Sequence, residues 1–219
     1  MLPASWHFAL LLLAAWRVGG FELKRAVLQS VARARRDGDA SSIVAAVERL
    51  EQSVAGTKID LTTLSGAWSL VYSTRASAST NTPSSSSLTS ALYKFFFKYL
   101  PFLAGSSGAD EAASTSLAAN IQEIDLNIGT ITNTVTPNSK VLPFGLRLCI
   151  VVKGECSPSP ARPDDTIDVV FTSFSLNDAL VIPLPRPKGS LRTTFCDGDF
   201  RVGRGGQGGL FLVKRVPQS

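Results

Sequence analysis

The chain has 219 residues, of which 44% are hydrophobic, so it is long and apolar enough to build one domain with a sizeable core. Its 22 lysine and arginine residues exceed its 17 acidic residues, but they are scattered along the chain, which argues against a nucleic-acid-binding protein. The only histidine is His7, so the main body of the chain lacks the imidazole that histidine triads, histidine-ligated zinc and histidine proton shuttles require. We therefore expect no catalytic residues, no metal site and no cofactor.

The chain begins with a short apolar run from Phe8 to Trp16, whereas about twenty residues are needed to cross a bilayer. Small residues at Val18 and Gly20 predict that residues 1–20 form a signal or targeting segment that is cleaved before Phe21. Two other interpretations stay open. The run is either the product of a misassigned or degraded start of the coding sequence, or an interfacial helix that remains attached.

Residues 21–60 are predicted to form an N-terminal helical region, because apolar residues recur at near-helical spacing between Lys24 and Glu51. The sequence Asp37-Gly38-Asp39 is expected to separate two helices, with Ser41 or Ser42 as the N-cap of the second. The basic residues of this region fit three interpretations: a surface for anionic membranes, the body of a transit peptide, or a solvated helix face.

The first clear strand is predicted from Leu64 to Thr74, with Trp68 and Tyr72 on its buried side. A serine-, threonine- and alanine-rich insert follows over residues 75–119. Within it, the aromatic-rich segment 92–103 predicts a short helix. Such an apolar helix has to be covered, so we expect it either to plug the core of the domain or to act as a lid that contacts a membrane or gates a ligand.

The rest of the chain predicts strands joined by turns, with no helix between most of them. The expected strands span residues 121–126, 130–136, 144–153, 166–176, 179–182, 191–195, 199–202 and 209–214. This order excludes alternating strands and helices and favours an up-and-down barrel or a sandwich over residues 61–217. A barrel of about eight antiparallel strands is wide enough to hold one small ligand.

Two arginines of a late strand, Arg201 and Arg204, are candidates to stack over Trp68 where the two ends of the sheet meet. Closing the barrel is their expected role, and ligand contact is the alternative. The three cysteines, Cys149, Cys156 and Cys196, are an odd number, so at least one thiol is unpaired within the chain and a disulfide-built fold is not expected.

Three segments of the sequence resemble the plastid lipid-associated proteins, also called fibrillins. They are the first strand LSGAWSLVYST, the segment NIQEIDLNIGTITN, and the closing segment LRTTFCDGDFRVGRGGQGGLFLVKR. The positions that match the family pattern are Gly66, Trp68, Tyr72, Gln122, Asp125, Asn133, Thr194, Asp197, Asp199, Arg201, Arg204 and Gly205. The chain departs from the pattern at Arg192, Phe195 and Cys196, where the family usually has aspartate, tyrosine and leucine.

The resemblance implies a mainly β, lipocalin-like antiparallel barrel of about eight or nine strands, with N-terminal helices and the aromatic-rich helix inserted after the first strand. It implies a plastid (chloroplast) protein, peripherally associated with plastoglobules, thylakoids or a lipid-droplet surface. Such a protein binds or organises hydrophobic molecules such as prenylquinones, carotenoids or other lipids. The residues expected to bind the ligand are Trp68, Tyr72, Gln122, Asn133, Phe195, Arg201 and Arg204.

Two alternative functions remain at this point. The chain is an enzyme acting on a lipophilic substrate if carboxylates such as Asp125, Asp197 or Asp199 work with Arg201 or Arg204, although Asp197 and Asp199 flank Gly198 and fit turn positions better. It is a secreted lipocalin-like carrier if the mature chain starts at Phe21.

Overall fold

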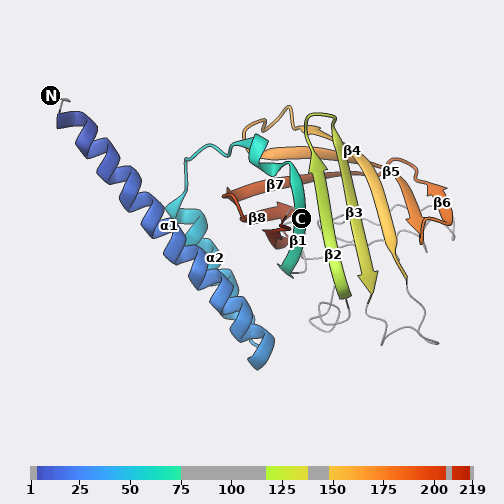
Figure 1. The fold of residues 1–219 in the computed structure, drawn as a ribbon, viewed down its shortest axis with the longest axis horizontal. Coiled ribbons are helices and arrows are strands. Elements are labelled where there is room, and N and C mark those ends of the chain that lie inside the picture. The colour runs from blue at the N-terminus through green and yellow to red at the C-terminus, as the bar shows by residue number, and fades with distance from the viewer. Residues whose placement is uncertain (1–3, 75–116, 138–147, 206–208, 218–219) are drawn as a thin grey trace. The chain divides into compact units, whose positions relative to one another are not determined.

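The computed structural model describes residues 4–74, 117–137, 148–205 and 209–217 (Figure 1). The chain divides into two compact units, Met1–Thr57 and Lys58–Ser219. The aromatic-rich segment 92–103 and the first part of the strand expected over 144–153 lie outside the described residues.

The first unit is a pair of helices, α1 (Ala4–Asp37) and α2 (Ser41–Ser53), which pack against each other. The expected break between them is confirmed: Gly38 has φ +74° and its N–H donates to the carbonyl of Ala34 at 2.8 Å, which ends α1. The N-cap expected at Ser41 or Ser42 is wrong. The cap position is Ala40, and Asp39 Oδ1 instead accepts from the N–H of Ser41 at 2.9 Å.

Apolar side chains spaced along one face of each helix are buried. They are Val27, Val31, Ile43, Ala46, Val47 and Leu50. Helix α1 is continuous through residue 20, and cleavage before Phe21 stays a prediction. Among the described residues, no helix combines the length and the apolar character that crossing a membrane requires.

The second unit is mainly β, and its described residues form nine strands (Figure 1). The strands are β1 (Gly66–Ser73), β2 (Leu117–Asp125), β3 (Thr130–Pro137), β4 (Ile150–Pro158), β5 (Thr166–Leu176), β6 (Leu180–Pro183), β7 (Lys188–Cys196), β8 (Phe200–Gly205) and β9 (Leu210–Arg215). All pairings are antiparallel, and eight strands close a barrel in the order β1-β2-β3-β4-β5-β7-β8-β9 and back to β1. The structure therefore selects the barrel over the sandwich.

The ninth strand, β6, lies outside the barrel because β5 is long enough to have two partners along one edge. The first half of β5 pairs with β7, from Thr166 to Val170, and its second half pairs with β6, from Ser173 to Leu176. The turn into β6 uses positive φ angles at Asn177 and Asp178, two residue types that adopt this conformation more readily than most.

The fourth strand differs from the sequence prediction, which ended it at Lys153. Strand β4 instead runs from Ile150 to Pro158 and passes through Gly154. A Cβ atom on Gly154 would lie 2.8 Å from the carbonyl oxygen of Val170 and 3.3 Å from a side-chain atom of Ile131. Gly154 thus lets two neighbouring strands approach closely.

Residues that face each other across an antiparallel pair lie on the same side of the sheet, so the register defines the inner and outer faces of the barrel. The inner face carries one apolar cluster that includes Ile131, Val152, Ile167, Phe211 and Val213. The outer face of β8 and β9 is also buried. Its apolar residues are Phe200, Val202, Leu210 and Leu212.

Candidate functional site

Trp68 lies on the inner face of the barrel, and two arginines contact its ring. It is completely buried on β1, and its Nε1–H donates to the carbonyl of Leu64 at 2.8 Å. The Cζ atoms of Arg201 and Arg215 lie 5.0 and 4.3 Å from the centre of its ring, within cation–π distance. The predicted stacking of Arg201 on Trp68 is confirmed, and Arg215 is a second partner that the sequence did not reveal.

Arg215 uses all three guanidinium nitrogens to hold backbone segments together. Its Nε donates to the carbonyl of Gly198 at 2.7 Å, Nη1 to that of Ser65 at 3.0 Å, and Nη2 to that of Thr63 at 2.5 Å. These bonds tie the start of β1, the turn between β7 and β8, and the end of β9. Arg215 therefore has the barrel-closing role that the sequence suggested for Arg201 or Arg204.

The glycine of the Gly-x-Trp motif makes room for this arginine. Gly66 has φ +129°, which other residues rarely adopt, and a Cβ atom there would collide with Nη1 of Arg215. The spacing of Gly66 and Trp68 is thus explained by one contact: the indole supports the guanidinium from one side, and the glycine leaves it space near the strand backbone.

Arg201 has a very different environment, although it lies against the same indole. It is 1% exposed and is the only buried charged side chain among the described residues. Its Nη2 donates to Gln122 Oε1 at 2.5 Å, and Gln122 Nε2 donates in turn to Asn133 Oδ1 at 3.1 Å. A guanidinium can only donate, so the oxygen of Gln122 must point toward Arg201 and its NH2 group toward Asn133. Asn133 then accepts with its oxygen, and its Nδ2 group is left as a donor at the end of this hydrogen-bond relay.

Several polar atoms next to this relay have no hydrogen-bond partner among the described residues. They are Arg201 Nε and Nη1, Asn133 Nδ2, both amide atoms of Asn120, and Thr193 Oγ1. Asn120 lies two positions before Gln122 on the same face of β2, and Thr193 faces Gly203, two positions after Arg201. The sequence prediction missed both residues, although the alternation of β2 placed Asn120 on the side of Gln122.

Among the described residues, the charge of Arg201 also has no ion-pair partner. Burial is the main cause that lowers the pKa of Arg201, Cys196 raises it and the charge of Arg215 lowers it; together they bring this pKa to about 10, so Arg201 stays protonated at neutral pH. Burial raises the pKa of the Cys196 thiol, which keeps that thiol neutral. No carboxylate of the described residues forms an ion pair or a hydrogen bond with Arg201.

The other predicted ligand residues lie on the outer face. Register shifts on β1 and β7 change the alternation, so that Tyr72 faces Leu212 and Phe195 faces Val202. The ring of Phe195 packs 6.3 Å from that of Phe200. Arg204 faces Arg192 and Leu210, also on the outer face. The barrel interior thus brings together Trp68, Gln122, Asn133 and Arg201, but not Tyr72, Phe195 or Arg204.

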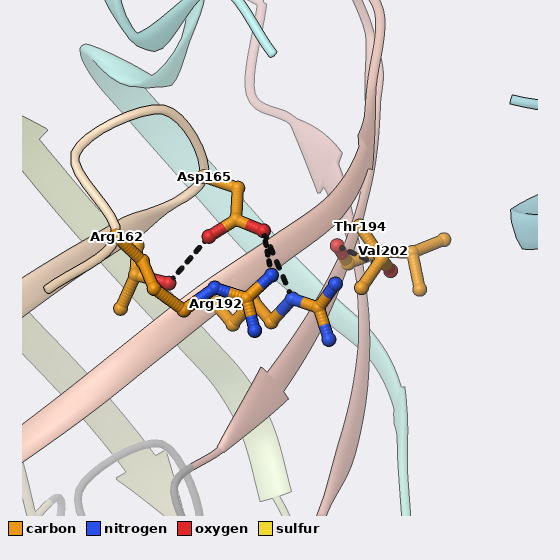
Figure 2. Close-up of polar contacts among 6 residues, drawn as sticks. Arg162, Asp165, Arg192, Thr194 and Val202 are labelled. Carbon is orange, nitrogen blue, oxygen red and sulfur yellow. Dashed lines mark hydrogen bonds and ion pairs between the residues drawn. The ribbon is translucent and has the colours of Figure 1, made fainter. Parts of the chain in front are cut away.

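Two departures from the family pattern, Arg192 and Phe195, are also outside the barrel. Figure 2 shows Arg162 and Arg192 directed at Asp165, whose Oδ2 they contact at 2.7 and 3.0 Å. The same view includes Thr194, whose hydroxyl donates to the carbonyl of Val202 at 3.5 Å. Arg192 therefore supports the start of β5 from the outside, and neither substitution alters the inner face.

Two of the carboxylates considered for an enzyme accept backbone hydrogen bonds at turns. Asp197 Oδ1 accepts from the N–H groups of Asp199 and Phe200 at 3.0 and 2.8 Å, and Asp125 Oδ1 accepts from that of Asn127 at 2.9 Å. The turn role expected for Asp197 is confirmed. The three cysteines are free thiols, so no disulfide joins the segments to which they belong.

Comparison of the chain with known proteins gives no match to a family model and none to a curated protein.

Proposed function

We propose that the barrel is a non-enzymatic carrier that binds one lipophilic small molecule against its inner face. The observation that carries this proposal is the closed eight-stranded barrel whose inner wall is apolar except for a layer of unpartnered polar groups beside Trp68. Barrels of this size enclose a single small ligand when their side chains leave room for it. Apolar walls with a few polar groups are typical of such sites.

We further propose that the protein is a plastid lipid-associated protein of the fibrillin kind, acting at plastoglobules or thylakoids on prenylquinones, carotenoids or other lipids. The support is the sequence pattern quoted above together with the fold. Motif residues from distant parts of the chain, Trp68, Gln122 and Arg201, contact one another inside an antiparallel barrel. Fractionation of the source cells, with detection of the protein in plastid lipid bodies, tests the location.

Binding is tested by purifying the full chain, removing bound lipids, and titrating it with a neutral fluorescent lipophilic probe such as N-phenyl-1-naphthylamine. We expect saturable binding of one probe per chain. Mass spectrometry of the lipids that co-purify from the native source then identifies the natural ligand. Absence of both saturable probe binding and stoichiometric bound lipid would refute the carrier function.

A pair of variants on β2 shows whether the probe binds inside the barrel. Asn120→Phe fills the inner face where an amide has no described partner, and we expect it to weaken probe binding by about tenfold or more, since the added ring takes the space of the ligand. Ile121→Phe adds a ring to the other face of the same strand and serves as the control. Equal binding of the probe by both variants would show that it binds outside the barrel interior.

A further inference from the structure

We propose that the ligand of the barrel is an acid, and that its anionic head group, a carboxylate or a phosphate, lies against Arg201 inside the barrel. This inference rests on the proposed carrier function and specifies the chemistry of its ligand. Three observations support it. They are the charge of Arg201, which no described residue compensates, the surplus of hydrogen-bond donors around it, and the apolar side chains that follow these polar residues around the inner face of the barrel.

The first observation is the charge. Arg201 is buried and protonated, yet its described partners are the neutral side chains of Gln122 and Trp68. An isolated buried cation is unfavourable unless an opposite charge and further hydrogen bonds compensate it. A bound water molecule satisfies hydrogen bonds but supplies no charge, whereas an anionic head group supplies both.

The second observation is the kind of atoms left without partners. Arg201 Nε and Nη1 and Asn133 Nδ2 are donors only, and the hydroxyl of Thr193 and the amide of Asn120 each offer a donor as well. The relay from Arg201 through Gln122 fixes this polarity at Asn133. A ligand that matches the layer therefore has to present acceptors, and the oxygens of a carboxylate or a phosphate are acceptors.

The third observation is the row of inward residues that continues around the barrel from the polar layer. Gln122 faces Asn133, Asn133 faces Val152, and Val152 faces Phe174, on strands β2 to β5. The two amides are thus followed at the same level by two buried apolar side chains. A molecule with an acidic head group at Arg201 and an apolar body along Val152 and Phe174 matches this change from polar to apolar side chains.

A structural role alone does not account for Arg201. The backbone segments at the closure of the barrel are joined by Arg215, all of whose guanidinium nitrogens have partners. Arg201 has one hydrogen bond and two nitrogens without a described partner on the same indole. This contrast distinguishes a residue that closes the fold from one that is left available for a ligand.

The test is displacement of the neutral probe from the lipid-free full chain by matched pairs of competitors. Oleic acid is compared with oleyl alcohol, and farnesyl phosphate with farnesol, so that each pair differs in the head group. We expect the acid of at least one pair to bind about tenfold or more tightly than its alcohol. Preference in the first pair identifies a carboxylate ligand, and preference in the second identifies a phosphate ligand.

Variants of β8 then assign the preference to a residue. Arg201→Met keeps a similar volume without the charge, and we expect it to remove the preference for the acid, with the affinity for the alcohol changed by less than about threefold. Arg201→Lys retains a charge and should keep part of the preference. Arg204→Met, on the outer face of the same strand, is the matched control and should bind as the wild type does.

The outcomes separate this inference from the carrier function. If the probe binds but acids and alcohols compete equally in the wild type, the acidic ligand is wrong and the carrier function stands. If acids are preferred but Arg204→Met removes the preference and Arg201→Met does not, the head group lies outside the barrel and the site is wrong. If Arg201→Met does not fold, the competitor pairs still show whether an acid is preferred, and Arg201→Lys still shows whether that preference depends on Arg201. Failure of the neutral probe, together with the absence of stoichiometric bound lipid, refutes the carrier function itself.

Discussion

Arg215 and Arg201 lie against the same indole ring of Trp68, but their surroundings differ in almost every other respect. Arg215 is partly buried and donates to three backbone carbonyls, two in the segment before β1 and one in the turn between β7 and β8. Arg201 is fully buried, donates to one side-chain amide, and has two nitrogens without a described partner. The same residue type on the same aromatic ring thus has all its guanidinium nitrogens bonded in one case and two without a described partner in the other.

The difference shows that stacking on an aromatic ring does not by itself indicate function. A cation–π contact contributes about 0.5–2 kcal/mol depending on exposure, for either arginine. What separates the two is the remaining hydrogen-bonding capacity of each guanidinium after folding. Counting satisfied and unsatisfied donors is therefore more informative about a binding role than the contact with Trp68.

Removing the shared indole should have the largest effect, because it affects both arginines. We expect Trp68→Ala to lower the free energy of unfolding by about 3–5 kcal/mol, since it deletes the largest fully buried side chain and leaves a cavity. Urea unfolding followed by circular dichroism measures this. Val181→Ala, at an exposed position on β6, is the control. A loss no larger than that of the control would contradict the central position of Trp68.

The second prediction compares the two arginines directly. Arg215→Met should destabilise the barrel by about 2–3 kcal/mol, because three carbonyls lose a charged donor. Arg201→Met should change stability by less than about 1 kcal/mol, since it replaces an uncompensated buried charge by an apolar side chain. Both are measured by urea unfolding. A larger loss for Arg201→Met than for Arg215→Met would reverse the roles assigned to them.

The third prediction concerns the glycine beside Arg215. Gly66→Ala should cost about 1–3 kcal/mol, because φ +129° is strained for alanine and its methyl group would displace Nη1 of Arg215. In the Arg215→Met background the steric part of this loss should shrink while the backbone part remains. Strictly additive losses in the double variant would show that Gly66 does not act through Arg215.

The smallest effect is expected on the outer face, at Asp165. Partial burial raises the pKa of this carboxyl, but hydrogen bonds from Thr166 and Arg192 and the charges of Arg162 and Arg192 outweigh it and hold the pKa below its ordinary value. The stabilisation is therefore fully present above the unfolded-state pKa and is lost as the pH falls through the folded-state pKa. Asp165→Asn should cost about 1 kcal/mol or less at neutral pH.

Unfolding curves of the wild type and Asp165→Asn at several pH values measure this effect. The difference between the two stabilities should begin to shrink as the pH falls below the unfolded-state pKa of about 4, and it should disappear below the folded-state pKa of Asp165. Arg186→Gln, which removes an exposed pair with Glu155 at 2.7 Å, is a comparison for an ion pair without the additional hydrogen bonds. A difference between wild type and Asp165→Asn that persists unchanged at low pH would show that the charge of Asp165 is not its source.

The sequence by itself determined the elements that depend on local pattern. Alternation of apolar and polar residues located the strands from residue 121 onward, and Asp37-Gly38-Asp39 located the helix break because only a few residues separate the groups involved. The stacking of an arginine on Trp68 could also be predicted from the sequence, since the Gly-x-Trp pattern and an arginine on a late strand can be recognised there. The end predicted at Lys153 for the fourth strand was wrong, because β4 continues through Gly154, where the lack of a Cβ atom allows close strand packing.

Only the tertiary structure decided which side chains enter the barrel. A register shift of a single residue transfers a side chain to the opposite face, and the shifts on β1 and β7 moved Tyr72 and Phe195 outward. Nothing local in the sequence marks these shifts, because they arise from pairing with strands far away in the chain. For the same reason, the pairing of Arg215 with Trp68 and the lack of partners around Arg201 are properties of the closed barrel and not of any segment in it.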